Sequence, residues 1–113
     1  MTLGTGTLSP AEPGLLRGEA TFDVRGTFPL WLDCLSKDRG QNTARLRVGS
    51  AACQVWEFHG NAMDGEPARY WHGHIEVEGY QMRVRIVPGA PWGVEFHDCK
   101  QRDEQLYQVE TNV

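Results

Sequence analysis

From residue 19 onward, apolar and polar residues alternate along much of the chain with a period of two. This period is typical of a strand with one buried face, because successive side chains of a strand point to opposite sides. Residues 20–34 therefore predict one long strand. Gly26 interrupts its apolar row, which predicts a bulge or kink, and Pro29 lies in the outward row, where it suits an edge or a bend. The inward residues of this strand are Ala20, Phe22, Val24, Phe28, Leu30, Leu32 and Cys34.

Residues 43–58 predict a β-hairpin with a two-residue loop at Gly49-Ser50. Glycine at the first loop position is what a type II′ turn requires. In the resulting register, the apolar residues of both strands lie on the same face of the hairpin. This agreement supports the register. The expected pairs are Val48–Ala51, Arg47–Ala52, Leu46–Cys53, Arg45–Gln54 and Ala44–Val55.

Residues 69–87 predict a second hairpin, with its loop at Glu78-Gly79. Its inward face is apolar, and its outward face carries charged and imidazole side chains. The inward residues are Trp71, Ile75, Val77, Tyr80, Met82, Val84 and Ile86. The outward residues are His72, His74, Glu76, Arg83 and Arg85.

These patterns predict an all-β protein: a strongly curved antiparallel sheet or small barrel built from β-hairpins, of about five or six strands. Residues 1–18 are rich in Gly, Thr, Ser and Pro and predict a flexible, loosely ordered N-terminal arm. Residues 36–42 read as a turn and residues 61–68 as a loop. The remaining chain, residues 19–113, is expected to form a single β domain.

A chain of 113 residues with 40% hydrophobic and 23% charged residues has the composition of one soluble domain. Its apolar runs are too short to span a membrane, and we see no secretory signal. Cys34, Cys53 and Cys99 are odd in number and widely spaced, which favours reduced thiols and a cytoplasmic location. The formal net charge of −4 disfavours strong non-specific binding to duplex nucleic acid.

The His72-x-His74 pair raises the question of a metal site. The segment GEPARYWHGHIEVE followed by PWGVEFH resembles the two metal motifs of the cupins, and the resemblance implies His72, His74, Glu78 and His97 as ligands. The hairpin register, however, puts an arginine opposite each of the two histidines and Glu78 in the turn. Those arginines would repel a bound cation. We therefore expect a solvated face, no metal and no other cofactor.

A second resemblance concerns the order of the elements. The Arg-led strand from Arg45 to Gly49, the strand that ends near Trp56 and the strand that begins at Tyr70 resemble a small, uncharacterised family of bacterial plasmid and mobile-element β-proteins. The resemblance implies a similar fold. By analogy it suggests an inhibitor or accessory factor of a phage or mobile element.

No segment combines a nucleophile, a base and an orienting group, so we expect a binding protein rather than an enzyme. Tryptophan and arginine in outward rows suit a protein interface, and exposed strand edges suit a partner's strand or a homodimer. The same residue types also suit single-stranded nucleic acid, and Trp56 and Phe58 alternatively suit a second small core beneath the N-terminal arm. The candidate partner-binding residues are Trp31, Arg45, Arg47, Trp56, Phe58, His72, His74, Glu76, Arg83 and Arg85.

Overall fold

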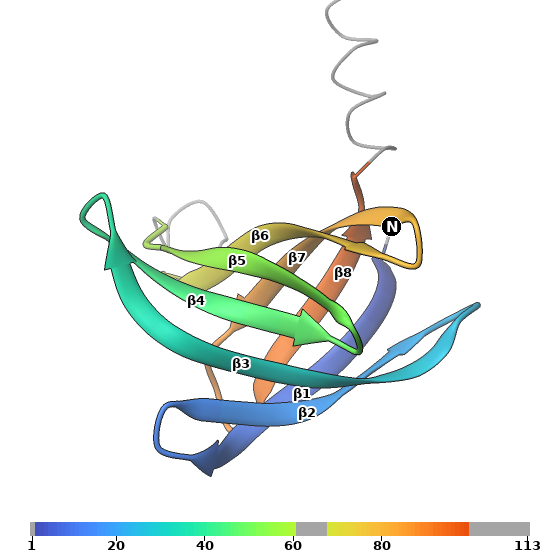
Figure 1. Cartoon of the computed structure of the whole chain (residues 1–113), viewed down its shortest axis with the longest axis horizontal. Coiled ribbons are helices and arrows are strands. Elements are labelled where there is room, and N and C mark those ends of the chain that lie inside the picture. The colour runs from blue at the N-terminus through green and yellow to red at the C-terminus, as the bar shows by residue number, and fades with distance from the viewer. Residues whose placement is uncertain (1, 61–67, 100–113) are drawn as a thin grey trace, which may run out of the picture.

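The computed structural model describes residues 2–60 and 68–99, and of Cys34 only the backbone. Eight strands follow one another in these residues. They are β1 (Thr2–Glu12), β2 (Leu15–Phe22), β3 (Gly26–Asp38), β4 (Gln41–Val48), β5 (Ala51–Phe58), β6 (Tyr70–Val77), β7 (Tyr80–Val87) and β8 (Trp92–Asp98). Each pairs antiparallel with the next, and β1 also pairs with β8, so the sheet closes into a barrel (Figure 1).

The expected all-β fold and the small barrel are confirmed, with eight strands rather than five or six. No helix among the described residues is long and apolar enough to cross a membrane. The loop expected at 61–68 lies almost wholly outside the described residues, and so does the chain after Cys99.

Both predicted hairpins are present with the predicted registers. Val48 pairs with Ala51 across Gly49-Ser50, and Val77 pairs with Tyr80 across Glu78-Gly79. Gly49 has a φ of 58°, while Glu78 and Gly79 have φ values of 50° and 81°. Positive φ at both positions makes Glu78-Gly79 a type I′ turn, whereas Gly49-Ser50 has a positive φ only at the glycine, as the predicted type II′ turn requires.

The single long strand expected over residues 20–34 was wrong, because the chain reverses at residues 23–25. Ala20 pairs with Phe28, and Phe22 pairs with Gly26. A turn of three residues leaves even-numbered residues facing even-numbered residues, so the inward row continues in phase through the reversal. The alternation alone therefore cannot distinguish one strand from this hairpin. Val24, expected inside, lies in the turn and is 93% exposed.

The loosely ordered arm expected over residues 1–18 was also wrong. Residues 2–12 form β1, which pairs with β2 on one side and with β8 on the other. Leu8 is fully buried in the barrel. The N-terminal segment is therefore a structural part of the barrel, and the β domain includes it.

The glycines of β1 explain why its pattern is not apolar. Gly4 pairs with Phe22 of β2 and with Phe96 of β8, so it lies between two inward-facing phenylalanines. The two rings meet with their centroids 4.9 Å apart. A Cβ atom at Gly4 would lie 2.5 Å from the Phe22 ring. The side chains of the neighbouring strands thus fill the space that a side chain of β1 would occupy.

The interior of the barrel is filled by apolar side chains, as expected for a closed sheet of eight strands. The inward residues predicted for the second hairpin are buried, except Tyr80, which is 37% exposed. Cys53 packs against this core as predicted, and burial raises the pKa of its thiol to about 11. The inward position predicted for the Cys34 side chain lies outside the described side chains. The largest fully buried residues include Trp71, Phe96, Leu8, Leu30, Leu46 and Ile86.

One cation links two turns at one end of the barrel. Arg25, in the turn between β2 and β3, donates hydrogen bonds to the carbonyl oxygens of Val77 and Glu78, at 3.0 and 3.1 Å. Its guanidinium also lies 5.1 Å from the centre of the Tyr80 ring. These contacts hold the β2–β3 turn against the β6–β7 turn.

Closure of the barrel pairs β1 with β8, so neither end of the sheet is an open edge strand. The homodimer through strand edges stays a prediction. Around the described barrel, the shortest pairing joins β5 to β6, where Val55–Phe58 meet Tyr70–Gly73 over four residue pairs. Residues 51–54 of β5 and residues 74–77 of β6 are not paired with one another.

We expect Gly18→Ala to lower the free energy of unfolding by about 1–3 kcal/mol, because overpacking a tight site forces the backbone to shift. A Cβ atom at Gly18 would overlap the backbone carbonyl of Thr7 in β1. Gly93→Ala is the matched control, since a Cβ atom there has no neighbour within 4 Å. Urea denaturation measures both. Equal stability of the two variants would contradict the close packing of β1 against β2.

Candidate functional site: an aromatic patch on the outer face

The barrel registers align a row of outward side chains across four strands. Trp56 of β5 pairs with His72 of β6, His72 pairs with Arg85 of β7, and Arg85 pairs with Glu95 of β8. Phe58 and Tyr70 form the next outward pair along β5 and β6. Directly opposed side chains on one face of an antiparallel pair interact, so this register brings the aromatic rings together.

We call Trp56, Phe58, Tyr70 and His72 the aromatic patch. The ring centroids of Phe58 and Tyr70 are 5.1 Å apart, and that of His72 lies 6.2 Å from each of them. Trp56 and His72 are separated by 6.5 Å. Centroid separations of about 4.5–7 Å at tilted angles are those of interacting aromatic pairs. The patch is thus one contiguous cluster.

The aromatic patch lies at the surface rather than in a second core. Phe58 is 42% exposed, His72 is exposed, and Trp56 and Tyr70 are half-buried. The alternative of a core beneath the N-terminal arm is wrong, because β1 pairs with β2 and β8 and does not cover β5 or β6. Arg85 covers one ring, with its Cζ atom 4.6 Å from the centre of Tyr70.

His72 favours its neutral form in this cluster. Burial, and secondly the nearby His74, hold the pKa of His72 below its ordinary value. The two histidines and the opposing arginines have the expected register, with His72 across from Arg85 and His74 across from Arg83. A neutral imidazole suits the edge-to-face contacts that His72 makes with Phe58 and Tyr70.

The four residues of the cupin-like motif are not brought together. His72 and His74 lie on the outer face of β6, and Arg83 lies between His74 and His97 in the row across β7. Glu78 is in the turn, 3.8 Å from Arg25. Among the residues that the structure describes, no three His, Cys, Asp or Glu side chains are placed to hold a metal ion.

Other predicted site residues lie apart from the aromatic patch. Trp31 of β3 pairs with Arg47 of β4, whose guanidinium lies 4.9 Å from the centre of the Trp31 ring. Arg47 also contacts Asp33 at 3.2 Å. Arg45 lines a shallow groove of about 400 Å³ over β4 and β5. Glu76 is exposed farther along β6.

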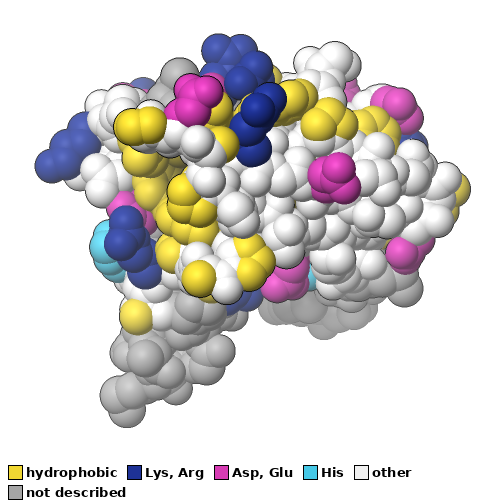
Figure 2. Space-filling model, turned by 90° about the horizontal axis from the view of Figure 1, so that it is seen from below, with side chains coloured by type: hydrophobic (Ala, Val, Ile, Leu, Met, Phe, Trp, Pro, Cys, Tyr) yellow, Lys and Arg dark blue, Asp and Glu magenta, His cyan; other side chains and the backbone are white. Residues whose placement is uncertain are grey.

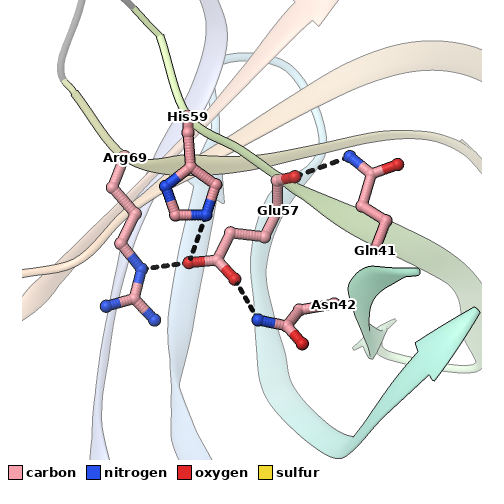
Figure 3. Close-up of polar contacts among 5 residues, drawn as sticks. All are labelled: Gln41, Asn42, Glu57, His59 and Arg69. Atoms are coloured by element: carbon pink, nitrogen blue, oxygen red, sulfur yellow. Dashed lines mark hydrogen bonds and ion pairs between the residues drawn. The ribbon is translucent and has the colours of Figure 1, made fainter.

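A polar cluster around Glu57 was not predicted (Figure 3). Glu57 is 2% exposed. It faces inward near the C-terminal end of β5, where it pairs with Trp71. Asn42 donates a hydrogen bond of 2.6 Å to Oε2, while the Arg69 Nε contacts Oε1. His59 Nε2 lies 3.5 Å from Oε1, and Gln41 donates to the Glu57 carbonyl oxygen at 2.6 Å.

These contacts keep a buried carboxylate ionised. Burial acts to raise the pKa of Glu57, but hydrogen bonds from Asn42 and Arg69, together with the charges of Arg69 and His59, outweigh it and hold the pKa below its ordinary value. The sequence did carry a signal for this buried carboxylate, in the alternation of inward and outward residues along β5. Glu57 falls in the same inward row as Cys53 and Val55, where an acidic residue needs buried partners.

Comparisons with protein-family models, with curated proteins and with solved structures give no match to this chain. The geometry described above is therefore the basis for assigning a function.

We expect Glu57→Gln to lower the free energy of unfolding at pH 7 by about 1.5–3 kcal/mol, the range for hydrogen bonds to a charged group. Because the folded-state pKa is lowered, ionised Glu57 stabilises the fold above pH 4.5, its ordinary value. That stabilisation is lost as the pH falls through the folded-state value.

Urea denaturation of the wild type and the variant at pH 7 and near pH 3 tests this. The difference between the two proteins should shrink at the lower pH. Glu76→Gln, at an exposed position on β6, is the matched control and should change little at either pH. A Glu57→Gln effect that is independent of pH would contradict the assignment of an ionised carboxylate.

Proposed function

We propose that this protein is a non-enzymatic binding protein that recognises a protein partner through the aromatic patch. The observation that carries the proposal is the contiguous set of surface rings Trp56, Phe58, Tyr70 and His72 on the outside of β5 and β6. An inhibitor or accessory factor of a phage or mobile element is a small binding protein of this kind.

The composition of the aromatic patch supports a protein interface. Tryptophan, tyrosine and arginine are the residues that most often carry binding energy when an interface buries them. Here a tryptophan and a tyrosine lie beside Phe58, and Arg85 packs over Tyr70. The rings already contact one another, so little side-chain freedom is lost when a partner covers them.

The charges of the described surface favour protein over nucleic acid. Two arginines away from the aromatic patch are already engaged within the chain: Arg47 with Asp33 and Trp31, and Arg25 with Glu78 and Tyr80. Glu95 follows Arg85 in the row of the aromatic patch. A phosphate backbone is bound by cations that release its counterions, and carboxylates interspersed among them oppose this. The net charge of −4 acts in the same direction.

Single-stranded nucleic acid is the second candidate. Surface rings on a barrel sheet can stack with successive bases, and Arg85 and Arg83 lie beside the aromatic patch on β7. This candidate makes a different prediction about salt, because each neutralised phosphate releases condensed counterion.

We expect the double variant Trp56→Ala, Phe58→Ala to weaken the partner complex by about 2 kcal/mol or more without unfolding the domain. Trp31→Ala is the matched control, because Trp31 is also an outward tryptophan but lies on β3, apart from the aromatic patch. Immobilised wild type and both variants are exposed to an extract of the source cells, and retained proteins are identified by mass spectrometry. The partner is then purified and titrated calorimetrically. A partner lost equally from both variants, or retained equally by both, would contradict the proposal.

We expect a short mixed single-stranded oligonucleotide to bind no more tightly than about 1 mM at physiological salt, the behaviour of a surface without a phosphate footprint. Fluorescence anisotropy at two salt concentrations measures this. Micromolar binding that weakens steeply with salt, and that Trp56→Ala reduces, would instead establish the nucleic-acid candidate.

A further inference from the structure

A cleft of about 460 Å³ opens at the end of the barrel where β3 ends and β4 begins. Three of its lining residues are apolar: Leu35, Trp71 and Trp92. Leu35 is 63% exposed, whereas Trp71 is 2% exposed and so belongs to the deep part of the cleft. On the face that Figure 2 shows, hydrophobic side chains gather toward one end and are bordered by Lys and Arg. This volume is within the range of about 300–1,000 Å³ that small-molecule sites occupy.

Trp71 carries a hydrogen-bond donor that the protein does not use. Its Nε1–H is buried and has no acceptor among the described residues. A buried donor without an acceptor lowers the stability of the fold, because it has lost its hydrogen bond to water and gained none in return. Such groups are therefore rare in native structures. Trp71 lines the cleft, but this nitrogen has almost no accessible surface, so a bound molecule supplies the missing acceptor only when neighbouring side chains shift.

The charges of the cleft select for an anion. Lys37 and Arg69 line it, and among the residues that the structure describes no Asp or Glu lines it. Arg69 uses its Nε to contact Glu57, which fixes the side chain and leaves the terminal nitrogens on the other side of the guanidinium. Asn42 is held by its own hydrogen bond to Glu57. The Glu57 cluster thus orients two polar side chains at the cleft.

We propose that this cleft binds a small carboxylic acid with a flat apolar group. The apolar group packs against Trp71, Trp92 and Leu35, and the carboxylate accepts hydrogen bonds from Arg69 and Lys37. A shift of neighbouring side chains on binding opens the Trp71 N–H as a third donor. This site is separate from the aromatic patch, so it is independent of the proposed protein partner.

The probe is 2-naphthoate, with uncharged 2-naphthamide as the comparison ligand. Binding is followed by the indole N–H signals in two-dimensional NMR, which report each tryptophan separately. We expect 2-naphthoate to shift the Trp71 and Trp92 signals with a dissociation constant of about 1 mM or lower, and the Trp31 and Trp56 signals to stay in place. We expect 2-naphthamide to bind about tenfold more weakly, since it lacks the charge-assisted hydrogen bonds.

Two variants test the roles of individual side chains. Trp71→Phe keeps an aromatic ring but removes the donor, and should weaken 2-naphthoate binding about fivefold. Lys37→Met keeps the apolar stem of an exposed side chain and should weaken it about two- to fivefold. Arg17→Gln, at an exposed position on β2, is the matched control and should leave the affinity unchanged.

The proposal is overturned if several millimolar 2-naphthoate moves neither the Trp71 nor the Trp92 signal. It is also overturned if the acid and the amide bind equally well and Lys37→Met changes nothing, because the cleft would then hold apolar molecules without recognising an anion. Lys37 is exposed and outside the core, so this second comparison decides the matter even if Trp71→Phe does not fold.

Discussion

The contact between Phe22 and Phe96 across Gly4 is the interaction on which the barrel depends. These rings come from the two strands that flank β1, and they meet only because β1 has no side chain between them. A side chain at Gly4 would push the rings apart or push β1 outward, and either change would separate β1 from β2 or β8. The strand that closes the barrel is thus held by its neighbours' side chains and its own backbone hydrogen bonds.

Turn length and the packing around β1 explain which parts of the fold could be predicted from the sequence. The two-residue turns at Gly49-Ser50 and Glu78-Gly79 were predictable, because each reverses the phase of the apolar row and leaves one consistent register. The reversal at residues 23–25 preserves the phase, so the sequence resembles one continuous strand. In β1 the inward positions Gly4 and Gly6 had to be small, which weakened the apolar signal that identifies a strand. Composition then favoured a loop where packing required a strand.

The candidate sites were also only partly predictable from the sequence. Alternation correctly placed Trp56, Phe58 and His72 in outward rows, but their meeting with Tyr70 depends on β5 and β6 being neighbours across the segment 59–69. No local pattern specifies that pairing. Glu57 was missed although its parity placed it inward. Its ionised state depends on Asn42 and Arg69, which come from β4 and from the residue before β6. The two sites share the end of β5, where outward rings and an inward carboxylate alternate.

The position of β1 also determines what removal of the N-terminal residues would expose. A chain shortened by its first dozen residues would lose no large apolar surface apart from Leu8, yet it would expose the long edges of β2 and β8 at once. Unpaired edges of this kind template pairing between molecules. The N-terminal strand therefore covers two edges that would otherwise be open to pairing with another molecule.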